Sequence, residues 1–238
     1  MRDNMKIEIL FPETCNLYGD IQNMEYLKKC LPDAEFINTG LDEDPRFINE
    51  KIDLIYLGPM TERMQEKVIQ KLLPYKEKIE ELIDKGTVFL FTGNALEVLG
   101  KYIENEDGTR IEGIGIFDTF AKRDMMHRYF GAVLGEGTGL DFVGFKVTFS
   151  FSYGENKDCY FFDVKKGIGL NKDSKLEGIR KNNFIGTYLI GPILIMNPLF
   201  TKYLITLLGV DEPKLAFEEE IIDAYNDRLE EFKSNRIK

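Results

Sequence analysis

The stretch TVFLFTGNALEVLG (residues 87–100) decides the fold, because it joins a short apolar run to a glycine turn and a helix-like segment. Residues 87–91 are almost continuously apolar, which is typical of a central strand that is covered on both faces. The segment from Asn94 to Leu99 suits the start of a helix. A buried strand that turns into a helix predicts an α/β protein with a mainly parallel central sheet.

The same alternation of strands and helices recurs on both sides of this stretch. Residues 62–85 have apolar side chains at helical spacing and are followed by Gly86, a common helix terminator. Pro74 lies inside this segment and should kink or split the helix. This alternation predicts a doubly wound sheet. Its other members are strands at residues 6–11, 34–38, 52–57 and 184–189 and helices at residues 20–31 and 199–208.

Beyond Gly113 the pattern changes to strand-like segments bounded by glycines, which predicts an antiparallel extension of the fold. These segments are residues 113–117, 129–134, 142–151 and 160–164. Pro213 then opens an acidic helix with an apolar stripe. We therefore divide the chain into one domain of residues 1–209 and an acidic C-terminal amphipathic helix within residues 210–238.

Composition excludes several classes of partner and location. The 238 residues carry 31 basic and 41 acidic side chains, for a net charge of −10, so nucleic acid and anionic membranes would be repelled. The apolar stretch at residues 184–208 is interrupted by prolines and Lys202, so we expect no membrane span. The start of the chain lacks the features of a signal peptide. Three unpaired cysteines indicate reduced thiols and a cytoplasmic protein without a metal site or cofactor.

Four turns at strand ends carry the informative motifs, since ligands of open α/β sheets bind at the carboxyl ends of the strands. They read NLYGD at residues 16–20, GPMTERMQ at 58–65, TGNALEVLG at 92–100 and GTYLIGP at 186–192, the last followed by Asn197-Pro198. In this order the motifs resemble those of the CobB/CobQ-like class I glutamine amidotransferases, most closely the amidotransferase subunit of bacterial lipid II isoglutaminyl synthase. The resemblance covers residues 5–208 and implies a flavodoxin-like three-layer fold.

The resemblance also shows which reactive groups this chain has replaced. The family's elbow motif CGGYQLLG carries the nucleophilic cysteine, and Gly93 stands at that position. The family's GTYLHGP motif carries the histidine base, and Ile190 stands there. The family's GGGQD turn on the oxyanion side becomes Gly58-Pro59-Met60-Thr61-Glu62, and a proline has no N–H to offer an oxyanion. We therefore predict vacant nucleophile and base positions and no catalytic residues.

Two other side chains could be imagined as substitutes for the lost dyad. Cys15 follows the first strand but has no evident activating base, so we interpret it as a spectator. His127, the only histidine, lies away from the strand-end turns. A polar crevice could still hold a small ligand such as glutamine, although the same residues could simply cap helices and satisfy strand ends. The predicted pocket residues are Asn16, Gly58, Pro59, Arg63, Gln65, Thr92, Gly93, Asn94, Glu97, Thr187 and Ile190.

These observations leave three hypotheses for function. The first is a subunit without glutaminase activity that binds or regulates a ligase or synthetase, as the resemblance implies through the family's Mur-ligase-like and cobyrinate-modifying partners. The second is an enzyme that uses the same crevice with other residues, such as Glu97 and Arg63, either as an active amidotransferase or on an unrelated substrate. The third is a sensor that binds an amino acid reversibly. We favour the first hypothesis, because the fold motifs are kept while the dyad is lost.

Overall fold

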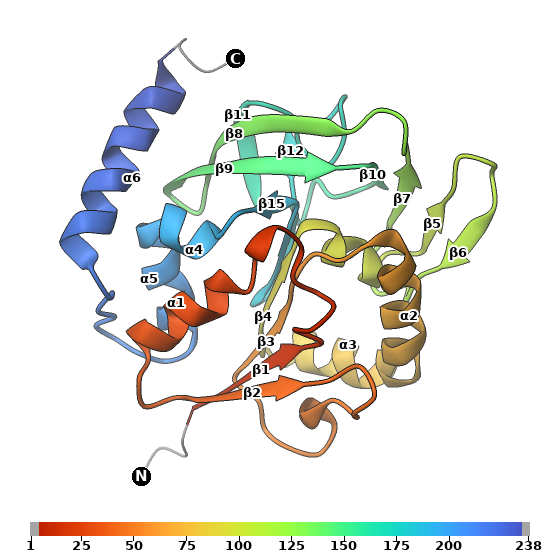
Figure 1. The fold of residues 1–238 in the computed structure, drawn as a ribbon, viewed down its shortest axis with the longest axis horizontal. Helices are drawn as coiled ribbons and strands as arrows, with labels where there is room; N and C mark the ends of the chain where they lie inside the picture. Colours follow the sequence, from red (N-terminus) through yellow and green to blue (C-terminus); the bar gives the residue numbers. More distant parts are fainter. Residues whose placement is uncertain (1–4, 235–238) are drawn as a thin grey trace.

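The computed structural model describes residues 5–234 and is built around a six-stranded sheet in the order β13-β14-β4-β3-β1-β2 (Figure 1). The neighbours from β14 to β2 are parallel, and only β13 is antiparallel to its neighbour β14. The central position of residues 87–91 is confirmed, since β4 pairs with both β3 and β14. The strands are β1 (Lys6–Leu10), β2 (Glu35–Thr39), β3 (Leu54–Leu57), β4 (Val88–Thr92), β13 (Ile179–Lys181) and β14 (Phe184–Thr187).

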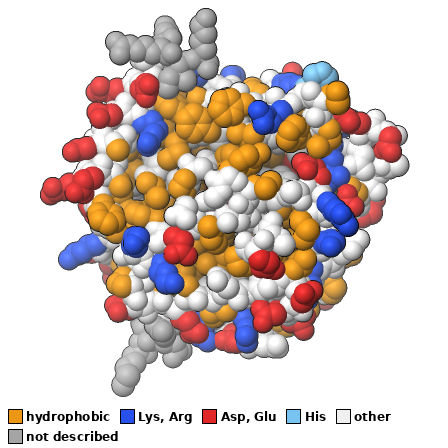
Figure 2. Space-filling view, viewed as in Figure 1, with side chains coloured by type: hydrophobic (Ala, Val, Ile, Leu, Met, Phe, Trp, Pro, Cys, Tyr) orange, Lys and Arg blue, Asp and Glu red, His pale blue; other side chains and the backbone are white. Residues whose placement is uncertain are grey.

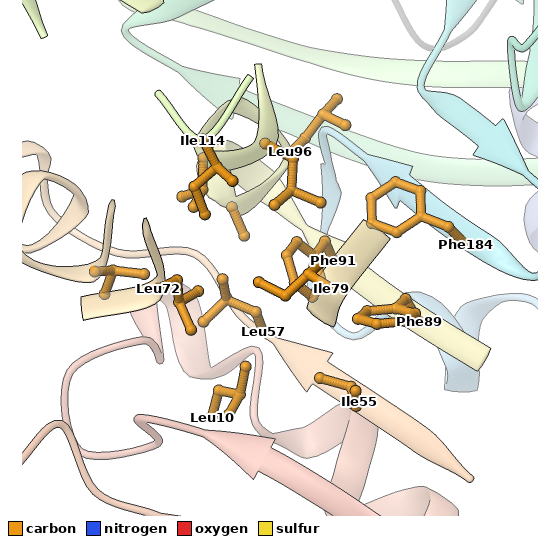
Figure 3. Packing of buried hydrophobic residues seen from close by; sticks show 14 of the residues in the cluster. Leu10, Ile55, Leu57, Leu72, Ile79, Phe89, Phe91, Leu96, Ile114 and Phe184 are labelled. Carbon is orange, nitrogen blue, oxygen red and sulfur yellow. The ribbon is translucent and has the colours of Figure 1, made fainter. Parts of the chain in front are cut away.

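Helices cover both faces of this sheet, which is why its strands are apolar on both sides. In β4, Phe89 and Phe91 pack with α2 and α3 on one face, as Figure 3 shows for part of this cluster, whereas Val88 and Leu90 pack with α1 and α5 on the other. The predicted interruption at Pro74 is confirmed: the short 3₁₀ helix η3 separates α2 from α3. The helices are α1 (Gln22–Cys30), α2 (Glu62–Leu72), η3 (Leu73–Tyr75), α3 (Lys76–Asp84), α4 (Ile193–Met196) and α5 (Pro198–Leu207).

The antiparallel extension consists of two smaller sheets that lie over the carboxyl ends of the central strands (Figure 1). One has the order β10-β7-β5-β6, and the other has the order β12-β11-β8-β9-β15. Their strands are β5 (Tyr102–Glu104), β6 (Arg110–Glu112), β7 (Thr119–Arg123), β8 (Tyr129–Gly137), β9 (Leu140–Thr148), β10 (Ser150–Gly154), β11 (Phe162–Lys166), β12 (Leu176–Glu177) and β15 (Leu189–Ile190).

The predicted strand at residues 113–117 is wrong. This glycine-rich segment is irregular and lies against the end of the 3₁₀ helix η4 (Gly93–Leu99). Its N–H groups bond to carbonyls of that helix end, for example Gly115 to Gly100 at 2.8 Å and Ile116 to Leu99 at 2.9 Å. A side chain at Gly113 would collide with the carbonyl oxygen of Gly100 at 2.2 Å, so the glycine permits this close approach.

The C-terminal helix α6 (Glu218–Lys233) begins later than Pro213, and Phe217 precedes it in the left-handed conformation with a φ of 56°. Tyr225 and Phe232 are buried against β8 and β9, and the Tyr225 hydroxyl donates to the Asp141 carbonyl at 3.0 Å. The division of the chain at residues 209 and 210 stays a prediction. Among the described residues, every helix is too short or too polar to cross a membrane.

Candidate functional site

Three of the motif turns meet at Gly93. This residue follows β4 and begins η4, and we call this strand-to-helix turn the elbow. The φ of +57° at Gly93 is a conformation that glycine adopts without strain. A β-carbon added to Gly93 would lie 2.6 Å from the Cβ atom of Pro59 and 3.3 Å from the Cγ2 atom of Ile190. The structure therefore brings Gly93, Pro59 and Ile190 together, and the direction in which a side chain would leave Gly93 is already filled.

A small cavity lies beside Gly93. Its volume is about 20 Å³, which is close to the space that one ordered water molecule needs. β9, β10 and the residues between them close one side of it, and the NLYGD turn closes the other. The lining residues are Leu17, Tyr18, Pro59, Met60, Glu62, Gly93, Asn94, Val147, Thr148, Phe149 and Ser150.

Asp20 holds the two turns that flank the site. Its buried carboxylate accepts hydrogen bonds from the Thr92 hydroxyl at 2.5 Å, from the Tyr56 hydroxyl at 2.7 Å and from the Gly191 N–H at 3.1 Å. Burial raises the pKa of Asp20, and these donors oppose the rise because they stabilise the charged form. Since Thr92 precedes Gly93 and Gly191 follows Ile190, one carboxylate fixes both the elbow and the turn after β15.

Asn94 joins the elbow to the turn that contains Pro59. Its side-chain oxygen accepts from the Met60 N–H at 3.0 Å, and its amide group donates to the Met60 carbonyl at 2.8 Å. The Leu17 N–H donates to the Pro59 carbonyl at 3.0 Å, which ties the first turn to the same place. The close contact between Pro59 and Gly93 is therefore held by hydrogen bonds from two directions.

Glu97 lies beneath the elbow, 3% exposed, at the centre of a second polar network. Its carboxylate accepts from the Gln65 amide at 2.8 Å, from the Tyr188 hydroxyl at 2.7 Å and from the Ser150 hydroxyl. Burial raises the pKa of Glu97, and these hydrogen bonds together with the charge of Arg123 lower it. Glu97 thus connects η4 to α2, β10 and the residue before β15.

Lys146 and Glu177 form a completely buried ion pair with an N–O distance of 2.8 Å. Glu177 also accepts from the Thr187 hydroxyl at 3.0 Å and the Tyr188 N–H at 2.7 Å. Burial lowers the pKa of Lys146, and the charge of Glu177 opposes this. Sequence reasoning missed Lys146, because a lone lysine in an alternating strand normally predicts a solvent-exposed position.

The predicted pocket residues fall into three groups. Pro59, Gly93 and Asn94 line the cavity, Ile190 contacts Gly93, and Gly58 adjoins them. Gln65, Thr92, Glu97 and Thr187 are buried, and their side chains bond to other protein groups instead of lining the cavity. Arg63 is exposed, and the Asn16 side chain accepts from the Ile21 N–H at 2.9 Å. Ligand binding by this set stays a prediction.

The chain's cysteine and histidine candidates lie apart from one another. Cys15 is buried, its Sγ atom lies 3.8 Å from the Met60 sulfur, and burial raises the pKa of its thiol to about 12. His127 is 77% exposed and lies 2.8 Å from Asp124. Within residues 5–234, the hydrogen bonds of Cys15 go to Thr14 and Met60, so no imidazole is placed to deprotonate it. The same residues hold no group of three or more His, Cys, Asp or Glu side chains that could share a metal ion.

A glycine-containing elbow after a central parallel strand, covered by an antiparallel extension, defines the class I amidotransferase type of α/β domain. The chain belongs to the family of the CobB/CobQ-like glutamine amidotransferase domain, which matches residues 6–197. It is similar to the lipid II isoglutaminyl synthase (glutamine-hydrolyzing) subunit GatD of Staphylococcus aureus strain N315, at 29% identity over 87% of this chain and 85% of that protein. It also resembles GatD of Streptococcus pneumoniae, at 26% identity over 94% of this chain and 91% of that protein.

Solved structures agree on the fold. A glutamine amidotransferase crystal structure superposes with a TM-score of 0.56 at 12% identity, covering 86% of this chain and 100% of that one. A glutamine amidotransferase from Thermotoga maritima superposes with a TM-score of 0.53 at 13% identity, covering 98% of this chain and 87% of that one. At these identities the likeness establishes the three-layer α/β architecture with its antiparallel extension.

Proposed function

We propose that this chain is an amidotransferase-like subunit that binds a ligase-type partner and does not hydrolyse glutamine. The observation that carries the proposal is the closed elbow. Even a β-carbon at Gly93 would lie 2.6 Å from Pro59. A nucleophile needs both a reactive atom at the elbow and space in front of it for the substrate, and this chain provides neither there.

The other parts of the acyl-transfer chemistry are also missing from this site. Ile190 has no titratable group to act as a base, and Pro59 has no N–H to stabilise an oxyanion. With a thiol pKa of about 12, Cys15 would be almost entirely protonated at neutral pH. The cavity beside Gly93 has a volume of about 20 Å³, far below the roughly 300–1,000 Å³ of typical small-molecule pockets.

The similarity to GatD supports the partner. Both curated relatives are named as subunits of a synthase, and the chain covers 85% and 91% of their lengths. The scaffold of such a subunit is therefore present almost in full. We infer that this chain associates with a ligase-type protein, as the relatives' names imply for them, and contributes binding or regulation to the complex.

Glutamate release from glutamine tests the proposal. We expect no turnover by the purified chain, either alone or with a ligase-type protein that binds it. The matched control is Cys15→Ala. If the wild-type chain releases glutamate and this substitution abolishes the release, the proposal is overturned. A variant that combines Gly93→Cys and Ile190→His with Pro59→Gly restores a thiol, an imidazole and a backbone N–H, and we expect it to gain activity over wild type.

A further inference from the structure

The ribbon formed by β8 and β9 has one apolar face that is only half covered. Cross-strand partners on this face are Phe130 with Val147 and Ala132 with Phe145, and the row continues to Leu134 with Val143. Tyr225, Leu229 and Phe232 of α6 pack on the Leu134 end of this row. α6 therefore covers one half of the face, and among residues 5–234 no helix packs on the half that contains Phe130 and Val147. Figure 1 shows α6 beside β8 and β9.

The uncovered half continues the same row of aromatic rings into solvent. Phe232 lies edge-on to Phe145 with ring centroids 5.8 Å apart, and Phe145 stacks on Phe130 at 6.4 Å. Phe130 is 67% exposed, and Met126 in the preceding loop is 81% exposed. Figure 2 shows hydrophobic side chains gathered on this part of the surface. Exposed aromatic and methionine side chains on one part of a surface are typical of a protein interface.

This patch reaches the mouth of the site. Val147, the partner of Phe130, lines the cavity next to Gly93 together with Thr148 and Phe149. On the opposite side the cavity is lined by Tyr18, whose side chain is 52% exposed and whose φ of 61° is unusual for a residue with a β-carbon. A protein that covered the Phe130 patch would therefore also cover the entrance to the vacant site.

Two exposed arginines that form no ion pair with residues 5–234 flank this surface. Arg128 directly precedes Tyr129, which pairs with the cavity-lining Thr148, and Arg63 follows the cavity-lining Glu62. Both arginines are exposed and make no ion pair with the described residues. The nearby carboxylate of Asp124, in contrast, contacts His127 and Lys172. In a chain of net charge −10, an apolar patch flanked by exposed arginines fits a partner surface that is apolar at its centre and acidic at its rim.

We propose that the docking surface for the ligase-type partner is the uncovered half of the β8–β9 face, centred on Phe130 and Met126 and flanked by Arg63 and Arg128. This inference rests on the function proposed above. A second copy of the chain fits less well, because a two-fold contact would bring the unpaired arginines of both copies into one interface. Binding here would seal the cavity beside Gly93, so the vacant site becomes part of the interface.

The test uses a ligase-type protein that co-purifies with the chain from its source cell, produced recombinantly and titrated against purified variants. Phe130→Ser combined with Met126→Ser removes the centre of the patch, and we expect binding to weaken at least about tenfold, the effect of losing a central aromatic anchor. Arg63→Glu should lower the association rate constant relative to wild type, and this difference should be larger at low salt than at high salt. The control is Phe217→Ser, an equally exposed aromatic residue (65%) at the start of α6, which should bind as wild type does.

The outcomes separate the two proposals. The docking surface is overturned if the Phe130→Ser, Met126→Ser variant binds the partner as tightly as wild type, or if Phe217→Ser weakens binding equally. Either result leaves the partner-binding function intact. Failure of the wild-type chain to bind any ligase-type protein overturns both. A wild-type dimer that the Phe130 and Met126 substitutions convert to a monomer, measured by light scattering, would assign the surface to a second copy. The urea midpoint of each variant should match wild type, since the substituted side chains are exposed.

Discussion

Replacing Gly93 with alanine tests the central claim that the elbow has no room for a side chain. Two costs add at this position. A residue with a β-carbon at a φ of +57° loses about 1–2 kcal/mol relative to glycine. The new carbon would lie 2.6 Å from the Pro59 ring, and such overpacking typically costs about 1–3 kcal/mol. We therefore expect Gly93→Ala to lower the free energy of unfolding by about 2–5 kcal/mol.

A matched control separates these two costs. Gly139 in the turn between β8 and β9 has a φ of +76°, and a β-carbon there would meet no heavy atom within 4 Å. Gly139→Ala should therefore show only the backbone cost of about 1–2 kcal/mol. Adding Pro59→Gly to Gly93→Ala removes the collision, so a double-mutant cycle should give a coupling energy of about 1–3 kcal/mol between the two positions.

Equilibrium unfolding in urea measures all four variants, with the free energy extrapolated to zero denaturant and the slope checked for two-state behaviour. If Gly93→Ala loses no more stability than Gly139→Ala, the space in front of the elbow is open. The same result would remove the main support for the proposal that this chain does not hydrolyse glutamine. A coupling energy near zero with Pro59→Gly would show that the proline does not close the elbow.

Two further predictions concern buried groups outside the elbow. Burial raises the pKa of Cys15 from its ordinary value of 9.0 to about 12, so its thiolate fraction at pH 8 falls about a thousandfold. Alkylation of Cys15, measured by peptide mass spectrometry, should be slower by at least that factor in the native chain than in urea. Labelling of native Cys15 as fast as that of Cys159 would contradict the burial. Lys146→Met leaves the Glu177 carboxylate buried without its cation and should cost about 3–5 kcal/mol in a thermal or urea unfolding experiment. Lys6→Met removes a half-buried ion pair with Glu50 at the surface and should cost much less; equal losses would refute the special role of the fully buried pair.

The central sheet was predictable because its signals are local. A continuous apolar run such as TVFLF identifies a strand that is buried on both faces, and β4 occupies the centre of the sheet. Pro74 predicted the break between α2 and α3 for an equally local reason, the missing N–H and the fixed ring. The family resemblance picked out Gly93, Pro59 and Ile190, and the rule that strand-end turns converge at one edge of a parallel sheet explains why the three lie together.

The features that sequence reasoning missed depend on contacts between distant segments. Residues 113–117 look like a strand, but their glycines allow the backbone to approach the end of η4 and take its hydrogen bonds there. Lys146 alternates with apolar neighbours in β9, and only its pairing with Glu177, 31 residues away, explains its burial. The closure of the cavity by residues 147–150 depends on how the antiparallel extension folds over the central sheet, which no short-range pattern encodes.

Three buried acids hold the turns around the candidate site in place. Asp20, Glu97 and Glu177 each accept at least three hydrogen bonds from groups on different elements, so removing any of them would leave several buried donors unpaired. These acids hold the turns around Gly93 through hydrogen bonds from Thr92, Gly191, Gln65 and Tyr188, and not through side chains at Gly93, Pro59 or Ile190. On the proposed function, these acids would keep the turns around Gly93 and the β8–β9 face above them in place without a nucleophile at Gly93.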